Sequence, residues 1–266
     1  MRCVTRLART RSLGQTGDDS PASLPATRQE LAGISRVFDL TRDFKGPEAT
    51  EQNFDRVAAE EGGLRRFPYL HFATHGVLDD QQPMRSALLL ARGSQTDPLQ
   101  QVLDGKEVYD GRLTAERMLR RWKLDAELVT LSACKTGLGR KAGGDGYLGF
   151  SQALFVAGAR SVIVSLWEVD DTATSLLMAR FYENLMGLPK ALPGGPLEAK
   201  SKAEALKEAK KWLRGLRPDE LDQLRDGLPR HGTRGRVVKK AAIEEPVLSY
   251  DNPYYWSGFI LIGDPG

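Results

Sequence analysis

Short apolar runs alternate with amphipathic stretches along most of this chain. The apolar runs are rich in Val, Ile, Leu and Phe, which is typical of strands buried on both faces. They cover residues 69–76, 128–134, 161–167 and 259–262. In the stretches between them, apolar residues recur every three or four positions, which predicts helices. The alternation of strands and helices predicts an α/β fold with a mainly parallel central sheet and helices on both faces.

The predicted helices lie before and between these strands. They start at residue 27 and then cover 51–66, 114–122, 147–157, 172–185 and 201–213. Thr27 with Glu30 matches a capping box, which marks the start of the first helix. Residues 87–91 and 102–109 are expected to be strands of a hairpin or of an excursion from the sheet.

The two ends of the chain differ in pattern. Residues 1–23 lack apolar periodicity and are predicted to be a disordered basic tail, so that 24–266 form the single folded domain. Residues 187–196 hold three prolines and three glycines, which predicts a loop. Residues 230–240 carry five cations and no acid, which favours a solvated surface loop over a site for an acidic partner.

Composition and charge exclude several classes of protein. The net charge is +3, and four arginines in the first eleven residues account for more than that excess, so the folded part has no basic surplus. This argues against a nucleic-acid-binding domain. No apolar run reaches the length of a membrane span and no secretory signal is visible, so we expect a cytoplasmic protein without membrane contact. Two cysteines, Cys3 and Cys134, are too few for a disulfide framework or a four-ligand zinc site, and no metal or organic cofactor is expected.

Two predicted strands end in reactive side chains. One ends in His75, followed by Gly76, and the other ends in Cys134, 59 residues later. Functional groups of an open α/β sheet gather at the carboxyl ends of its strands, so imidazole and thiol are expected at one edge. There the imidazole accepts the proton of the thiol and makes it a better nucleophile. The backbone N–H groups of Gly76 and Cys134 are the natural donors to an oxyanion.

These residues also have a structural interpretation, which spacing alone leaves open. Cysteine is among the most buried residue types, and a cysteine at a strand end is more often packing than chemistry. His71 is expected to be a core or supporting histidine, and His231 to face solvent. Residues 143–146 lack the Lys-Ser/Thr of a phosphate-binding loop, so a nucleotide site there is rejected.

Six motifs, in order along the chain, resemble those of the CHAT domain. They are His-Phe-Ala-Thr-His75-Gly76, Leu-Ser-Ala-Cys134-Lys-Thr-Gly137, Gly-Gly-Asp-Gly146-Tyr-Leu-Gly149, Ala-Gly-Ala-Arg160-Ser-Val, Ser-Leu-Trp167-Glu-Val-Asp170-Asp171 and Pro253-Tyr-Tyr-Trp256-Ser-Gly-Phe-Ile-Leu-Ile-Gly-Asp264. CHAT domains are caspase-like cysteine peptidases of the clan that also contains separases and gingipains. The resemblance implies a caspase-like three-layer sandwich, with His75 as general base, Cys134 as nucleophile, and Gly76 with Cys134 as oxyanion donors.

Three features depart from the family pattern. No convincing apolar strand precedes the first helix, no tetratricopeptide repeats are present, and Asn252 stands where the family usually has a histidine. The resemblance implies a protein or peptide substrate, and a regulatory partner such as a tetratricopeptide-repeat protein is a further expectation.

The acidic run after the third apolar strand is the candidate substrate pocket. Trp167, Asp170 and Asp171 are similar to a separase segment that helps to bind arginine, and Asp145 is a further candidate wall. We therefore expect a cysteine endopeptidase that cleaves protein substrates, with a basic-residue preference as the pocket hypothesis. The structural alternative is that one aspartate caps the following helix. The functional alternative is a catalytically silent scaffold of the same fold.

Overall fold

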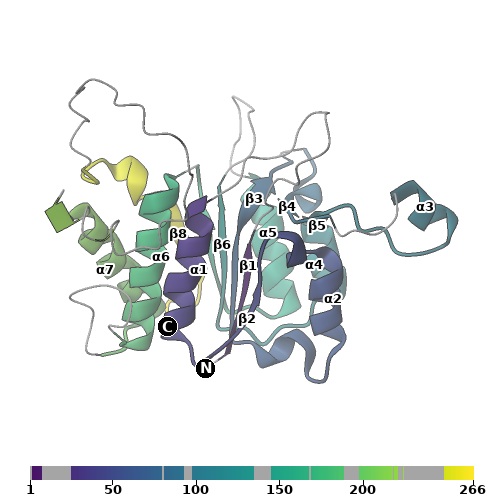
Figure 1. The fold of residues 1–266 in the computed structure, drawn as a ribbon, viewed down its shortest axis with the longest axis horizontal. Helices are drawn as coiled ribbons and strands as arrows, with labels where there is room; N and C mark the ends of the chain where they lie inside the picture. Colours follow the sequence, from purple (N-terminus) through teal and green to yellow (C-terminus); the bar gives the residue numbers. More distant parts are fainter. Residues whose placement is uncertain are drawn as a thin grey trace, which may run out of the picture.

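A sheet of eight strands forms the middle layer of the molecule, with helices on both sides (Figure 1). The computed structural model describes residues 2–7, 25–79, 81–92, 98–134, 145–167, 169–188, 198–217, 219–220, 224 and 249–266. The sheet order is β2 (Leu40–Phe44), β1 (Arg2–Leu7), β3 (Tyr69–Val77), β6 (Leu128–Cys134), β7 (Ser161–Ser165) and β8 (Phe259–Gly263). Two short strands, β4 (Ala87–Leu89) and β5 (Arg112–Thr114), extend the far end of β3.

The first five strands in this order run parallel to one another, as the apolar runs predicted. Strand β8 pairs antiparallel with β7 and forms one edge of the sheet. Parallel neighbours bring their carboxyl ends to the same edge. The ends of β3, β6 and β7 therefore lie side by side, which positions the candidate site.

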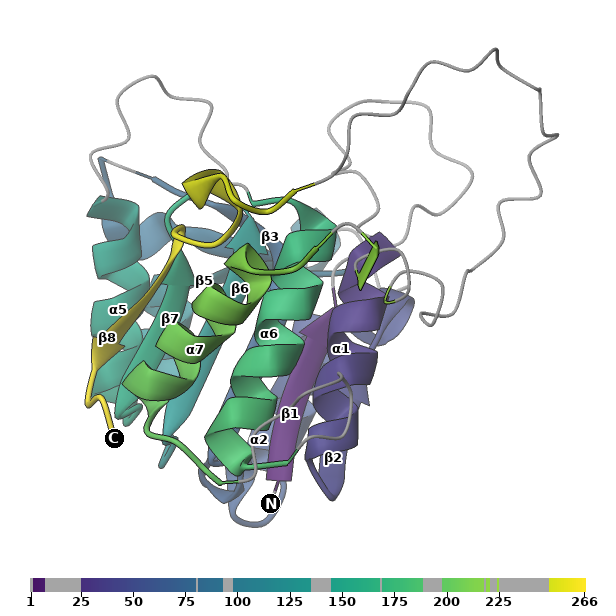
Figure 2. The ribbon, with the colours of Figure 1, turned by 90° about the vertical axis from the view of Figure 1, so that its left-hand side faces the viewer.

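Three helices cover each face of the sheet. On one face lie α1 (Pro25–Val37), α6 (Asp171–Met186) and α7 (Lys202–Arg214), side by side in front of the sheet in Figure 2. On the other lie α2 (Glu51–Ala59), α4 (Ala115–Arg121) and α5 (Asp145–Ala157). A short helix, α3 (Pro98–Leu103), stands away from these layers. This arrangement confirms the predicted three-layer α/β fold.

Each pair of layers encloses its own apolar core, and the alternation of side chains along β3 supplies both. Tyr69 packs with the cluster beneath α1 and α6, whereas Leu70 and Phe72 pack with the cluster beneath α2, α4 and α5. Consecutive strand residues point to opposite faces, so one strand serves two cores. In the second cluster the rings of Phe72 and Trp122 stack at 5.8 Å between centroids.

The structure corrects the expectation of a disordered tail over residues 1–23. Arg2–Leu7 form strand β1, which pairs with β2 on one side and β3 on the other. This strand also occupies the place of the opening strand that the sequence seemed to lack. Residues 8–24 lie outside the described part of the chain. A strand with two arginines shows no apolar run, yet ladder bonds on both sides hold it in the sheet.

Three other local expectations change. The run 102–109 is not a strand: Val102 belongs to α3, and the segment after it is held by Gln101, whose side-chain oxygen accepts from the Tyr109 N–H at 2.9 Å. Strand β2 was not predicted. The helix predicted over 51–66 is two elements, because the chain turns through Gly62 and Gly63, both with positive φ, before the 3₁₀ turn η2 (Gly63–Arg66).

No helix within the described ranges is long and apolar enough to span a membrane. Among the same residues, no group of three or more His, Cys, Asp or Glu side chains is placed to hold a metal ion.

Candidate active site

His75 and Cys134 are partners in the register of the sheet. They are the last of seven residue pairs that join β3 to β6, from Tyr69 with Leu128 onward. Adjacent strands lie about 4.8 Å apart, so the two backbones are in direct contact at the carboxyl ends of the strands. The side chain of Cys134 lies outside the described part of the structure, and the imidazole of His75 is half-buried.

A hairpin fixes the end of β3 that carries His75. Strand β4 pairs antiparallel with this end, which places His75 opposite Leu89 and Gly76 opposite Leu88. The Thr74 hydroxyl donates to the Leu89 carbonyl, and the Asp79 N–H donates to the Ser86 hydroxyl at 3.0 Å across the turn. Cys134 and β4 therefore flank His75 on its two sides. Gly76 is buried in the same strand.

A buried polar network lies deeper in the same face of β3 and β6. His71 Nε2 lies 2.9 Å from Glu30 Oε1, and its Nδ1 lies 3.2 Å from the Tyr182 hydroxyl. That hydroxyl is in turn 2.9 Å from Thr130 Oγ1. These contacts confirm His71 as a supporting core histidine. Glu30 was predicted to close the capping box of the first helix, and its observed contact is with His71.

Ser132 is a residue that the sequence analysis missed. It is the register partner of Ala73, two residues before the pair of His75 with Cys134. Its hydroxyl is buried and has no hydrogen-bond partner among the described residues. The signal was present in the motif Leu-Ser-Ala-Cys134, in which residues two apart share a face of a strand.

Trp167 lies at the same edge of the sheet. Leu131 of β6 and Val164 of β7 are register partners. Cys134 follows Leu131 by three residues and Trp167 follows Val164 by three residues, so Cys134 and Trp167 lie at the same level of the sheet. The Trp167 indole N–H donates to the Tyr254 carbonyl at 3.0 Å, and the two rings stack at 6.5 Å. Tyr254, from the 3₁₀ turn η4 (Pro253–Tyr255), is 47 % exposed. Trp167 and Tyr254 thus present stacked rings at this edge of the sheet, and the sequence analysis did not identify Tyr254.

The acids of the candidate pocket divide into different positions. Asp170 is the N-cap of α6, where its carboxylate accepts the Ala173 N–H at 2.9 Å. This supports the helix-cap interpretation for that residue. Asp171 occupies the first turn of α6 and is partly exposed. Asp145 begins α5, and its side chain lies outside the described part of the structure.

His75 does not line either of two cavities that described residues form. One of about 430 Å³ lies between α7 and β8, and one of about 270 Å³ lies between the end of α2 and Lys123.

A family model for the CHAT domain matches residues 7–264, so the chain belongs to the CHAT domain family. Its fold is that of the caspase-like cysteine peptidases, as the motifs implied. The chain is similar to the crystal structure of the Arg-specific cysteine proteinase gingipain R (RgpB), with 11 % identity and a TM-score of 0.43. The match covers 84 % of this chain and 44 % of the gingipain chain, so this chain spans less than half of that protein.

The chain is also similar to the Drosophila initiator caspase Dronc, with 11 % identity and a TM-score of 0.37. That match covers 81 % of this chain and 73 % of the caspase chain. No curated protein sequence matches the chain.

Proposed function

We propose that the protein is a cysteine endopeptidase in which His75 and Cys134 form the catalytic dyad. The observation that carries the proposal is their pairing at the ends of β3 and β6. It sets a base and a thiol on neighbouring strands at the edge where α/β folds hold their functional groups. Membership of the CHAT domain family supports the same chemistry.

In the proposed reaction, the His75 imidazole takes the thiol proton as the sulfur attacks the carbonyl carbon of the scissile bond. The negative charge on the carbonyl oxygen is met by the N–H groups of Gly76 and Cys134. The imidazolium then gives its proton to the leaving amine, which leaves a thioester on Cys134. Water, deprotonated by the same imidazole, hydrolyses the thioester and restores the thiol.

A fluorogenic peptide library tests this function. The wild-type protein should cleave a subset of peptides, and Cys134→Ala and His75→Ala should both abolish cleavage while the protein stays folded. Alkylation by iodoacetamide adds a second measurement, since His75→Ala should slow the labelling of Cys134. Absence of cleavage together with labelling no faster than that of free N-acetylcysteine would favour the scaffold alternative.

N-acetylcysteine is the reference thiol because Cys3 does not serve as one. The sequence placed Cys3 in an exposed tail, whereas it lies in β1 between β2 and β3. The rate at which Cys3 is alkylated in the folded protein therefore depends on its position in the sheet and does not represent a free thiol.

A basic residue ahead of the scissile bond is the substrate preference that we propose. Asp171 and the stacked rings of Trp167 and Tyr254 support it, while the cap formed by Asp170 assigns that acid to the helix. Asp171→Asn should lower turnover of Arg and Lys peptides by about tenfold or more, because one side of a desolvated ion pair is lost. Asp170→Asn is the matched control and should keep the preference. Preference for Leu or Met in the wild type would exclude the acidic pocket.

A further inference from the structure

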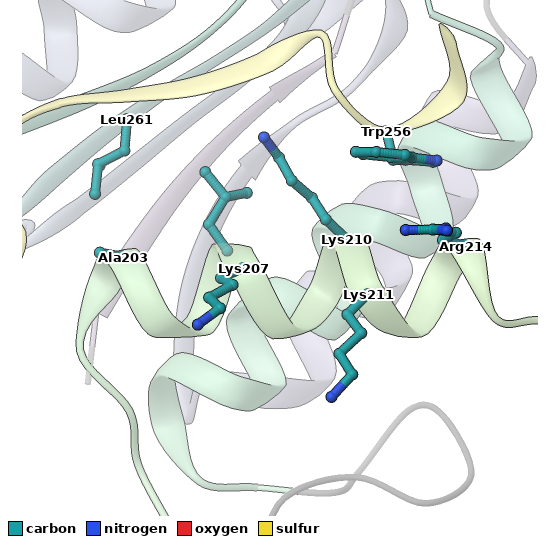
Figure 3. A pocket seen from close by; sticks show the side chains of 8 residues that line it. Ala203, Lys207, Lys210, Lys211, Arg214, Trp256 and Leu261 are labelled. Carbon is teal, nitrogen blue, oxygen red and sulfur yellow. The ribbon is translucent and has the colours of Figure 1, made fainter. Parts of the chain in front are cut away.

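A groove of about 430 Å³ runs between α7 and the edge strand β8, away from the candidate dyad (Figure 3). Leu206 and Leu261 supply apolar walls, and Trp256 closes one end. Cationic side chains make up half of its lining: Lys207, Lys210, Lys211 and Arg214. No acidic residue is among the lining residues. Lys210 extends across the groove toward β8 and Arg214 lies beside Trp256, whereas Lys207 and Lys211 extend from α7 away from β8 (Figure 3).

Within the described part of the chain, none of these four cations makes an ion pair. Lys210 reaches toward β8, where its Nζ donates to the Phe259 carbonyl at 2.6 Å. Burial lowers the pKa of Lys210. The Arg214 guanidinium lies 5.9 Å from the centroid of the Trp256 ring. Cations held over apolar surface without carboxylate partners attract a ligand that supplies the carboxylates.

The backbone of β8 offers a second set of binding groups. The Leu166 N–H donates to the Gly258 carbonyl and the Asp264 N–H to the Arg160 carbonyl, one at each end of the β7–β8 ladder. Bonded and non-bonded pairs alternate in an antiparallel ladder. It follows that Phe259, Leu261 and Gly263 direct their N–H and C=O groups away from β7. Phe259 is buried and its carbonyl already accepts from Lys210, so Leu261 and Gly263 supply the open part of the edge. Such an edge pairs readily with another extended segment.

We propose that this groove binds an extended acidic segment of a partner protein, which adds a strand to β8 and sets its carboxylates against the cations of α7. Strand addition supplies main-chain hydrogen bonds, while alternate side chains of the added strand face the helix. A second copy of this chain is disfavoured, because two groove linings would oppose cation to cation. Strands β6 and β7 separate β8 from β3, so docking leaves the candidate dyad open.

Fluorescence anisotropy with a labelled peptide of alternating glutamate and valine tests the proposal. The full chain carrying Cys134→Ala is used, so binding is measured without cleavage. The peptide should bind, and the matched glutamine–valine peptide should bind at least about tenfold more weakly, because the carboxylates are lost. Two further peptides carry N-methyl groups on the odd or on the even backbone nitrogens. One should lose binding and the other should keep it, since an added strand donates only alternate N–H groups to β8.

Charge reversal locates the site. Lys207→Glu combined with Lys211→Glu should weaken binding by about tenfold or more, as two attractive contacts become repulsive. Lys123→Glu reverses an exposed lysine at the cavity of about 270 Å³ near α2 and should leave binding unchanged. The proposal is overturned by no binding, by equal effects of the two N-methylated peptides, or by an oligouridylate that binds as tightly as the peptide. None of these outcomes bears on cleavage by the dyad, which is measured separately.

Discussion

His71 and Glu30 form a buried contact that joins the first helix to the strand of the candidate base. Nε2 of His71 lies 2.9 Å from Oε1 of Glu30, and the side chains are 0 % and 4 % exposed. Through Tyr182 and Thr130 the same network reaches α6 and β6. It therefore ties together both strands that end in the proposed dyad and two helices that cover them.

Removal of Glu30 from this network should destabilise the fold. Glu30→Ala leaves His71 buried without that partner, and an unsatisfied buried polar group costs about 1–3 kcal/mol. Glu30→Gln keeps a polar group of the same length and should cost less. The free energy of unfolding in urea measures both variants. Equal losses in Ala and Gln would show that the hydrogen bond to His71 contributes nothing.

The cap formed by Asp170 gives a separate stability prediction. Asp170→Ala removes the acceptor of the Ala173 N–H and should lower the free energy of unfolding by about 1 kcal/mol. Asp170→Asn keeps a side-chain oxygen at the N-cap and should retain most of the stability. Thermal and urea unfolding check the pair. A neutral Ala variant would remove the helix-cap assignment.

Gly149, the fourth glycine of the motif around Asp145, lets α5 lie close to the turn that follows β3. A Cβ at this position would overlap the carbonyl oxygen of Pro83 in the 3₁₀ turn η3 (Pro83–Arg85). Gly149→Ala should therefore cost about 1–3 kcal/mol through overpacking, despite the better helix propensity of alanine. Gly105→Ala is the comparison variant. A Cβ at Gly105 meets no atom, so any loss of stability there comes from its positive φ and not from overlap. An unchanged Gly149→Ala variant would show that η3 moves freely.

Glu60 should make stability depend on pH. Its carboxylate accepts from Arg66 and from Arg42, and these bonds lower its pKa below the ordinary 4.5. A depressed carboxyl pKa stabilises the folded state above the unfolded value, and this contribution is lost as the pH falls through the folded pKa. Glu60→Gln should thus melt at a lower temperature than wild type at pH 7.

The gap between these two melting temperatures should begin to narrow below about pH 4.5 and should close below the lowered pKa of folded Glu60, where its carboxyl is protonated in both states. In a protein that also carries Arg66→Met, Glu60→Gln should lower the melting temperature by less. The hydrogen bond from Arg66, which is the main cause of the lowered pKa of Glu60, is then absent. A gap that stays constant with pH would exclude the carboxylate as its source.

Local pattern was sufficient for most helices and for the strands that carry the dyad. The helices predicted at 172–185 and 201–213 match α6 and α7 within one or two residues, since their apolar faces repeat at helical spacing. The ends of β3 and β6 at His75–Gly76 and at Cys134 were likewise visible, because each apolar run stops there. Neighbours in sequence determine these features.

Pairing between distant segments decided the rest. The sequence put His75 and Cys134 at strand ends, but only the sheet order makes β3 and β6 neighbours and sets the two residues opposite each other. β1 was hidden because its short sequence shows no apolar run, and its place in the sheet is known only from its pairing with β2 and β3.

The roles of individual polar groups were decided in the same way. Nothing in the sequence indicates that His71 contacts Glu30 and Tyr182. These contacts form only when α1 and α6 pack on the sheet. From the sequence, the cations of α7 form the polar side of an amphipathic helix. Only the tertiary structure shows that they line a groove beside β8. Hydrogen bonds and charge act over a few ångströms, so their partners follow from the tertiary structure and not from spacing along the chain.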